Sequence, residues 1–346
     1  MNVENFARME NLTQNALSPR MQAVVRVLIT AIDEKMTKTG NPYVTFTVTD
    51  GTNTQSINSF HPQMIREKLI EAGYLNAVAD ILLRCDPKGY TNIDYLWPVP
   101  DADYSQYIPT PSIPFETMFN EVMGKLNNMV NAGAEIARVA EQLLQQNKDK
   151  LRYWSAAMKM HHNIYGGLFF HLYSVSKEAM QIVRGYQMAE PSSADAEGMI
   201  QTTLGEVDCP TLFVGALLHD IGKLRELETS PVGAATYTVD GTLFGHALLG
   251  ISMVEETINS LEDAEEFRQR NEKQIKNLLH IIASHHGKPE MGAIVTPATT
   301  EAYIVHQTDM LDSRLYVYGQ ETRTLESGGI SDRVYMLDKT PVVNLH

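Results

Sequence analysis

The stretch GALLHDIGKLREL, residues 215–227, decides the fold of the second half of this chain. An apolar run leads into His219-Asp220, and Ile221-Gly222-Lys223 follows directly. Adjacent residues on a helix point about 100° apart, so His219 and Asp220 reach a common ligand most easily where a helix ends. We expect Gly222 to end that helix, because glycine accepts the left-handed conformation of a C-terminal cap. The stretch therefore predicts a buried helix whose end presents an imidazole and a carboxylate together.

The same half of the chain holds almost all of the histidines. Of the 11 histidines, only His61 and His346 lie outside the segment 161–306. Imidazole and carboxylate together suit zinc, iron, manganese or nickel. Only two cysteines occur, Cys85 and Cys209, which argues against a Cys-rich structural zinc site. The pattern predicts a metal-dependent hydrolase.

The composition is that of an ordinary globular protein. The chain has 346 residues, of which 43% are hydrophobic and 20% charged, enough for two domains with real cores. The distant cysteines exclude a disulfide framework and favour a reducing compartment. We expect no secretory signal, because the first residues lack a basic segment followed by an apolar stretch, and no run approaches the ~20 apolar residues of a membrane span. We therefore expect a cytoplasmic protein outside the membrane.

The net charge of −14 argues against a broad binding surface for duplex nucleic acid. It leaves room for a narrow single-strand channel, because bound divalent cations and a few local Lys and Arg residues reverse the sign inside a cleft.

Residues 21–98 have the pattern of a small β domain. Val44, Phe46 and Val48 alternate with threonines, and Asp50-Gly51 is a hairpin signal. Strands are expected over 21–30, 44–48, 54–60, 77–84 and 90–98, with a helix around 61–72. Five short strands interrupted by one helix suit a small Greek-key β-barrel of the OB-fold type. A β-sandwich or a meander is the alternative.

The remaining segments follow from composition and helical spacing. Residues 1–20 are an N-terminal extension, and the proline-containing residues 99–113 are expected to form an extended linker. Helical periodicity then dominates residues 114–320, and 321–346 remain as a C-terminal tail. Helices are expected around 165–183, 209–219, 245–261, 272–284 and 299–318. The Ser/Ala/Glu-rich residues 185–207 are interpreted as a surface loop or insertion.

The second domain resembles the HD superfamily of metal-dependent phosphohydrolases, whose pattern is His … His-Asp … Asp. It resembles the bacterial YhaM-type 3′→5′ exoribonucleases more closely still. The stretches that carry the resemblance are HHNIYGGLFFHLYSV (161–175), GALLHDIGKLREL (215–227), TYTVDGTLFGHALLG (236–250), ASHHGKPEMG (283–292) and YIVHQTDMLDSR (303–314). The resemblance implies a two-domain protein, with an OB-fold over 21–98 and an all-α HD domain over 114–320.

The resemblance also implies a centre for two divalent metal ions. One cation would be held by His171, His219, Asp220 and Asp309. The other would be held by Asp220, His246 and the pair His285-His286, of which one member is free to bind phosphate or a neighbouring group. Manganese is the metal that the family suggests, and ligation rich in histidine equally tolerates iron, nickel or zinc. The pair is followed by Gly287-Lys288-Pro289 and not by a GYP signature, which disfavours cyclic-di-GMP hydrolysis.

The implied reaction is a 3′→5′ exonucleolytic hydrolysis of single-stranded RNA or DNA, with RNA favoured, that releases nucleoside 5′-monophosphates. Two cations would bridge a water and lower its pKa, and the resulting hydroxide would attack phosphorus in line. Asp220 and Lys223 are the catalytic candidates, with Lys223 neutralising charge on the nonbridging oxygens. The alternative is an HD phosphodiesterase that acts on cyclic or short oligonucleotides. Oxygen chemistry at a di-iron site uses similar ligands.

Further residues are candidates for binding the substrate. His161 and His162 could hold a phosphate, and structural packing explains them equally well. In the β domain, Tyr43 and Lys38 lie beside a turn and suit base stacking and backbone contact. Phe46, in phase with Val44 and Val48, is expected in the core. On the last expected helix, Asp312 would orient a neighbour of Asp309, and the family makes a homo-oligomer plausible.

Overall fold

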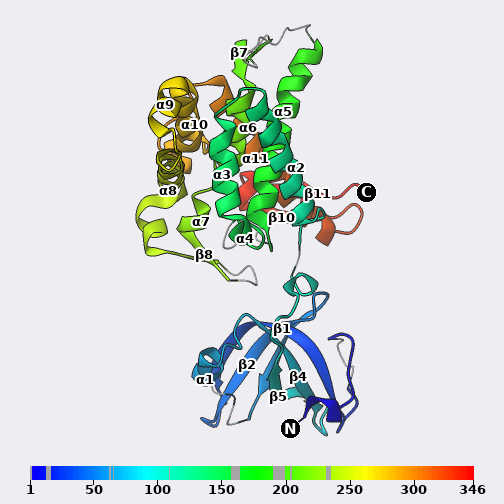
Figure 1. The fold of residues 1–346 in the computed structure, drawn as a ribbon. Coiled ribbons are helices and arrows are strands. Elements are labelled where there is room, and N and C mark those ends of the chain that lie inside the picture. The colour runs from blue at the N-terminus through cyan, green and yellow to red at the C-terminus, as the bar shows by residue number, and fades with distance from the viewer. Residues whose placement is uncertain are drawn as a thin grey trace. The chain divides into compact units, whose positions relative to one another are not determined.

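The computed structural model of the chain describes residues 2–12, 17–61, 64, 66–108, 110–156, 164–189, 199–202, 205–230 and 235–346. The chain divides into two compact units (Figure 1). The first covers the chain up to Thr110, and the second covers Pro111–Thr229 and Ala235–His346.

The first unit is built on five strands and one helix. They are β1 (Gln22–Met36), β2 (Pro42–Thr49), β3 (Thr54–Ser59), α1 (Arg66–Glu71), β4 (Ala77–Cys85) and β5 (Thr91–Pro98). The strands form one mixed sheet in the order β1-β2-β3-β5-β4, which closes on itself. Closure depends on β1, because Gln22–Ile29 pairs with β4 while Leu28–Met36 pairs with β2. A register shift between Ile29 and Ala31 marks the bend between these two halves.

The alternation of apolar residues along the strands produces the core of this unit. Val25, Val27 and Ile29 of β1 pack into one buried cluster with Phe46 of β2. Phe46 is 0% exposed, which confirms its predicted core position. Because successive strand residues point to opposite faces, an alternating sequence buries one face of a closed sheet completely.

The segments on either side of the strands differ from the predicted extension and linker. The short helix η1 (Val3–Asn5) opens the chain, and Leu12 is buried in the core of the strands. After β5, the short helix η2 (Tyr104–Gln106) leads to Tyr107, which packs with Leu28 and Val78. The prolines suggested an extended linker, but aromatic side chains gain more by covering exposed apolar surface.

The second unit is mainly helical. Its helices are α2 (Phe115–Asn131), α3 (Ala137–Gln146), α4 (Lys148–Leu151), α5 (Gly167–Ala189), α6 (Cys209–Leu218), α7 (Lys223–Glu226), α8 (Val239–Asn259), α9 (Ala264–Arg270), α10 (Glu272–Ser284) and α11 (Thr300–Thr324). The helix α6 is buried along its whole length except at Pro210, and it packs against α3, α5, α10 and α11 (Figure 1). Its continuous apolar sequence is therefore the sequence of a central helix.

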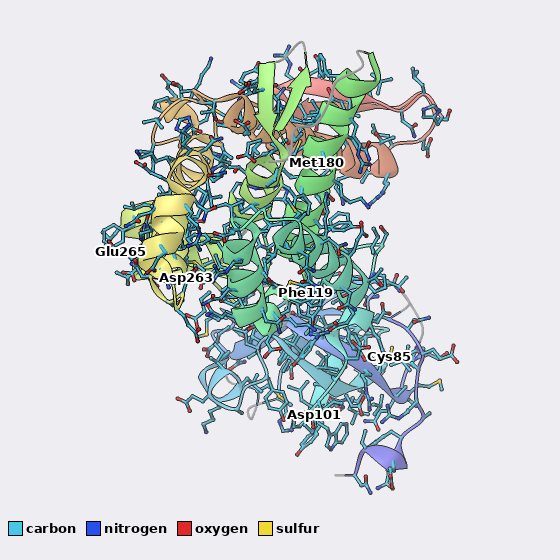
Figure 2. The ribbon with its side chains drawn as sticks, turned by 45° about the horizontal axis from the view of Figure 1, so that its top comes forward. Cys85, Asp101, Phe119, Met180, Asp263 and Glu265 are labelled. Atoms are coloured by element: carbon cyan, nitrogen blue, oxygen red, sulfur yellow. The ribbon has the colours of Figure 1, made fainter. Side chains whose placement is uncertain are left out.

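Aromatic packing joins the helices around α6. Phe119 of α2 lies among them and contacts the rings of Phe115 and Phe169, whereas Glu265 of α9 lies at the periphery (Figure 2). Among the described residues, no helix is both long enough and apolar enough to cross a membrane.

Three two-stranded hairpins complete the second unit: β6 (Met199–Thr202) with β7 (Gly205–Asp208), β8 (Leu227–Thr229) with β9 (Ala235–Tyr237), and β10 (Ile330–Val334) with β11 (Thr340–Val343). Two short helices, η3 (Pro289–Met291) and η4 (Tyr335–Leu337), lie in connections. The predicted loop over 185–207 instead contains the end of α5 and the hairpin β6–β7. The predicted tail over 321–346 instead contains the end of α11 and the hairpin β10–β11, because its valines and leucine find an apolar surface on α11.

Candidate metal centre

Five elements of the second unit bring the seven predicted ligands together. The positions are His171 near the start of α5, His219 and Asp220 in the turn after α6, His246 inside α8, His285 and His286 directly after α10, and Asp309 in α11. Two groups of three residues have donor atoms within 4.8 Å of one another: His171 with His219 and Asp220, and His246 with His285 and His286.

The turn after α6 places His219 and Asp220, but Gly222 contributes differently from our prediction. Its backbone is right-handed, with φ −61° and ψ −17°, so the predicted left-handed cap is wrong. A Cβ on Gly222 would lie 1.9 Å from the carbonyl oxygen of His246 and 2.5 Å from the nitrogen of Gly250. The glycine is needed because the turn and α8 approach each other closely at the backbone.

A second glycine positions His246. The helix α8 is broken at Gly245, whose φ of 69° is left-handed, so His246 begins the second half of α8. The sequence predicted a helix start at this histidine, and the break explains why α8 extends upstream to Val239.

Asp220 lies between the two groups of histidines, with its carboxylate almost fully buried. Its Oδ2 atom is 3.4 Å from Nε2 of His171 and accepts a 2.6 Å hydrogen bond from Nζ of Lys223. Its Oδ1 atom is 3.3 Å from Nε2 of His246 and 3.5 Å from Nε2 of His285. One carboxylate therefore faces both groups, with one oxygen directed to each.

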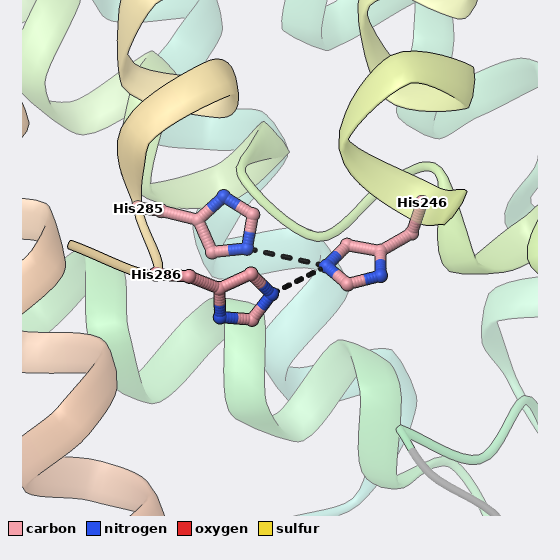
Figure 3. A group of neighbouring side chains, drawn as sticks. All are labelled: His246, His285 and His286. Atoms are coloured by element: carbon pink, nitrogen blue, oxygen red, sulfur yellow. Dashed lines mark hydrogen bonds between the residues drawn. The ribbon is translucent and has the colours of Figure 1, made fainter. Parts of the chain in front are cut away.

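The donor atoms within each group are close together. In the first group, Nε2 of His171 is 3.2 Å from Nε2 of His219 and 3.2 Å from Oδ1 of Asp309. In the second, Nε2 of His246 is 3.3 Å from Nε2 of His285 and 2.9 Å from Nε2 of His286 (Figure 3). Donor atoms about 2.1 Å from one cation lie about 3 Å apart, so both groups match the spacing of a ligand set.

The opposite ring nitrogens show which atoms are free to bind a cation. Nδ1 of His171 faces Oδ2 of Asp312 at 2.6 Å, and Nδ1 of His246 faces Oε1 of Glu226 at 3.0 Å. Nδ1 of His219 and of His285 face backbone carbonyl oxygens at 2.8 Å. Because these oxygens accept, each Nδ1 donates its proton, which leaves each Nε2 as the ring atom that can bind a cation.

These Nε2 atoms converge within the two groups, and electron-rich donor atoms at such distances repel each other unless a proton or a cation is shared between them. In addition, Oδ1 of Asp220 is buried and has no hydrogen-bond partner among the described residues. A buried carboxylate oxygen without a partner is costly in a protein interior. The residues present therefore fit two divalent cations.

The protonation states agree with metal binding. Burial lowers the pKa of His219 to about 4, and burial together with the neighbouring His285 lowers the pKa of His286 to about 3. Both imidazoles are therefore neutral near pH 7, as a metal ligand must be. Burial opposes the ionisation of Asp220, but the charge of Lys223 and the nearby imidazoles hold the pKa of this carboxyl well below its usual range.

His171 differs from the other histidines because three carboxylates face it. Burial would lower its pKa, but Asp220, Asp309 and Asp312 raise the pKa well above its usual value. The shift shows how much negative charge converges on this ring, and a divalent cation neutralises such charge as a proton does.

Two further residues support the centre: Glu226, which the sequence prediction missed, and His306, to which the sequence assigned a supporting role at most. Oε1 of Glu226 accepts from both the backbone N–H and Nδ1 of His246, each at 3.0 Å. Nδ1 of His306 lies 2.7 Å from the carbonyl oxygen of His285. Gly287 lies against that imidazole, because a Cβ there would be 2.3 Å from His306. Glu226 has no sequence signal, since a buried and a solvated glutamate look alike in an amphipathic stretch.

A cavity of about 870 Å³ opens beside the centre. Asp220, Lys223, His285, His286 and Asp309 line it, and residues of α11, of the segment after α10 and of the β10–β11 connection continue its wall. The volume lies within the range of ligand-binding sites. The metal centre is therefore accessible to a substrate.

The predicted substrate-binding residues are His161 and His162 of the second unit and Lys38 and Tyr43 of the first. His161 and His162 lie outside the described residues. Lys38 is exposed in the turn between β1 and β2 of the first unit, and the ring of Tyr43 stacks on that of Phe60 with centroids 5.2 Å apart.

The comparisons with known proteins agree with this centre. A family model described as HD domain matches residues 168–314. Three relatives are named 3′-5′ exoribonuclease YhaM. That of Listeria welshimeri is 30% identical over 247 residues, covering 71% of this chain and 70% of the relative. That of Listeria monocytogenes is 32% identical over 240 residues, covering 69% and 67%. That of Bacillus pumilus is 26% identical over 321 residues, covering 92% and 93%.

No solved structure matches the chain. The matched HD region contains all seven predicted ligands, and the relatives are named for a nuclease activity. The chain is thus a hydrolytic, metal-dependent enzyme, and it belongs to the family of YhaM 3′-5′ exoribonucleases.

Proposed function

We propose that this enzyme removes nucleotides from the 3′ end of single-stranded RNA and releases nucleoside 5′-monophosphates. The observation that carries the proposal is Asp220, whose two oxygens face two separate histidine groups beside a large cavity. The relatives named 3′-5′ exoribonuclease support the direction and the substrate. Our choice of metal is two manganese ions, and iron, nickel or zinc suits the same ligands.

The proposed ligands of one cation are His171, His219, Asp220 and Asp309, and those of the other are Asp220, His246, His285 and His286. Bound divalent cations supply an activated water and neutralise charge at the phosphate. The surrounding residues keep the ligands in position: Asp312 holds the Nδ1 proton of His171, and Glu226 does the same for His246.

Lys223 is the proposed contact to the scissile phosphate. Its ammonium lines the cavity and pairs with Asp220 at 2.6 Å. Burial would lower its pKa, but the charge of Asp220 raises it, so the side chain stays protonated at neutral pH. A fixed cation beside the centre stabilises charge that develops on the nonbridging oxygens of the phosphate.

We also propose that the first unit is an OB-fold that delivers the single strand. The closed strand order, with α1 between β3 and β4, is that of a small Greek-key barrel. Lys38 and the stacked rings of Tyr43 and Phe60 supply a charge and an aromatic surface for single-stranded RNA. In domain terms, we propose an OB-fold over 21–98 and an HD domain over 114–320.

The test is hydrolysis of a 5′-labelled single-stranded RNA by metal-stripped protein with added manganese, beside Asp220→Ala. We expect a manganese-dependent ladder that shortens from the 3′ end and is absent in the variant. A well-folded, metal-loaded protein that leaves RNA intact but cleaves cyclic or short oligonucleotides would replace the proposal by the alternative, a small-nucleotide phosphodiesterase.

A further inference from the structure

The C-terminal hairpin is attached firmly to α11. Leu337 and Val342 of the hairpin are buried against Val317 of the helix. An ion pair of 2.7 Å joins Arg314 of α11 to Asp338 in the hairpin turn. The hairpin is therefore a fixed part of the second unit and not a trailing segment.

The hairpin turn forms part of the wall of the cavity that contains the metal centre. Tyr335, Asp338 and Lys339 line the same cavity as Asp220 and Asp309. The turn itself is held in one shape, because the N–H of Lys339 donates to the carbonyl oxygen of Val334 at 3.0 Å. A substrate that reaches the metal centre through this cavity passes the hairpin.

Tyr335 presents an unusually open aromatic ring to solvent. It is 80% exposed, so the chain gains little from its apolar surface. An exposed tyrosine on a hairpin is often only a solvated surface residue. Here it lines the cavity of a nuclease. An aromatic ring in such a place stacks on any of the nucleobases, whatever the sequence of the RNA.

Two lysines of the same wall have no ion-pair partner among the described residues. Lys223 and Arg314 pair with Asp220 and Asp338, whereas Lys288 and Lys339 form no ion pair with any residue that the structure describes. The chain as a whole carries a net charge of −14. Two such ammonium groups beside the centre of so acidic a protein provide local sites for phosphate groups.

We propose that the C-terminal hairpin binds the 3′-terminal nucleotides of the RNA, with a base stacked on Tyr335 and backbone phosphates contacted by Lys288 and Lys339. The inference rests on the proposed exoribonuclease function and adds the residues that recognise the strand end. Tyr335 confers preference for a terminal nucleotide that carries a base, while the lysines bind any strand.

The experiment compares the kcat/KM of manganese-loaded full-length enzyme on two single-stranded RNAs, one with an ordinary 3′-terminal nucleotide and one whose terminal nucleotide is abasic. Stacking of one base predicts that the wild type prefers the ordinary RNA by about fivefold or more. Tyr335→Ala should abolish this preference, and Tyr335→Phe should retain it. Lys288→Ala and Lys339→Ala should raise KM on both RNAs and make log KM less dependent on log salt, by about 0.7 per contact.

Matched controls separate these effects from general damage. Tyr186→Ala removes an exposed tyrosine of α5, and Lys273→Ala removes an exposed lysine of α10; neither residue lines the cavity. Both should leave the preference and the salt dependence unchanged. RNA degradation with a base preference that is absent, or that persists in Tyr335→Ala, would overturn the inference alone. Absence of RNA degradation by the wild type would refute the proposed function and the inference with it.

Discussion

The two carboxylate oxygens of Asp220 have different surroundings, and the centre depends on this difference. Lys223 donates to Oδ2, whereas Oδ1 is buried with no hydrogen-bond partner among the described residues. A structural ion pair would satisfy both oxygens, because a buried acceptor without a partner costs about 1–3 kcal/mol. The unsatisfied oxygen is therefore a functional feature, and the residues around it should affect metal binding more than folding.

Glu226→Gln tests this expectation at the second metal site. The Glu226 carboxylate fixes the orientation of the His246 ring, because it accepts hydrogen bonds from both the backbone N–H and Nδ1 of His246. The glutamine side chain can turn its NH₂ group toward His246, and this group cannot accept a hydrogen bond. The imidazole ring is then no longer held in its orientation. Such supporting contacts contribute about 10- to 100-fold to metal affinity. We therefore expect the site of His246, His285 and His286 to bind manganese about 10- to 100-fold more weakly in the variant. Manganese titration followed by metal analysis measures the effect.

The matched control is Glu228→Gln, which changes an exposed glutamate two residues away. It should bind both metals as the wild type does. If Glu226→Gln also retained two tightly bound ions, the orienting role of Glu226 would be refuted.

Glu178 makes a prediction about pH. Burial, and to a smaller degree the charge of Asp312, raises its pKa to about 7, and its Oε2 atom has no hydrogen-bond partner among the described residues. Below about pH 4.5 the carboxyl is protonated in both the folded and the unfolded state. As pH rises toward 7, only the unfolded state ionises freely, so folding stability is lost. Glu178→Gln removes this loss.

The variant should therefore match the wild type near pH 4.5 and exceed its free energy of unfolding above pH 7, by about 1–3 kcal/mol. Thermal unfolding at several pH values measures the difference. Glu265→Gln, at an exposed position of α9, should show no such divergence. If the free energy of unfolding of Glu178→Gln exceeded that of the wild type by the same amount at every pH, packing and not ionisation would explain the difference.

Between elements, the closest packing lies where the turn after α6 meets α8. Gly222→Ala would place a Cβ 1.9 Å from the carbonyl oxygen of His246, and backbone on both sides leaves no flexible group to move. We expect a loss of at least about 3 kcal/mol in the free energy of unfolding, at or beyond the upper end of ordinary overpacking. Because the displaced residue is His246, activity should fall even at temperatures where the variant is folded.

Gly124→Ala is the natural comparison, since Gly124 lies within α2 with nothing within 4 Å of an added Cβ. There the change should stabilise the protein by about 1 kcal/mol or less, through helix propensity alone. Thermal unfolding should therefore show a lower melting temperature for Gly222→Ala and a higher one for Gly124→Ala. Equal stabilisation by both would show that the backbone at Gly222 has room.

The elements that the sequence predicted well are those with strong periodicity. The alternation through Val44–Val48 located β2, and the apolar run ending at Leu218 located α6. The candidate ligands could be named from the sequence because His219-Asp220 and His285-His286 are unusual residue pairs at the ends of apolar helices. Both signals are local, so they survive without knowledge of tertiary contacts.

The elements that were missed depend on distant partners. The strand Ile330–Val334 exposes most of its residues, and only contact with α11 makes the hairpin stable. Glu226 is important through His246, which lies 20 residues away. A short polar strand and a single glutamate carry no periodic signal, and isolated two-stranded hairpins are only marginally stable. Their roles arise from packing that composition does not reveal.

At the scale of the whole molecule, each unit has its own hydrophobic core. The strands of the first unit enclose one cluster around Phe46. The helices of the second enclose others around Phe169 and Val175. Separate cores allow the two units to be altered independently, so contributions to RNA binding and to hydrolysis are separable by mutation.

The last prediction concerns this division of labour. In the first unit, Tyr43 and Phe60 form a stacked pair in which Phe60 is 55% exposed. If this pair binds the RNA upstream of the 3′ end, the double change Tyr43→Ala and Phe60→Ala removes at least one stacked base. We then expect KM for a 20-nucleotide RNA to rise by about fivefold or more. KM for a trinucleotide should not change, because we expect so short a strand to bind only at the metal centre and its cavity.

The trinucleotide also serves as the control for folding, because an unfolded or metal-free enzyme would lose activity on both substrates. Tyr43→Phe, which retains the ring, should behave as the wild type on both RNAs. Equal losses on the long and the short substrate would show that the first unit supports the structure and does not bind RNA. A rise in KM confined to the long RNA requires a binding surface other than the metal centre and its cavity, and the aromatic pair on the strands of the first unit would supply it.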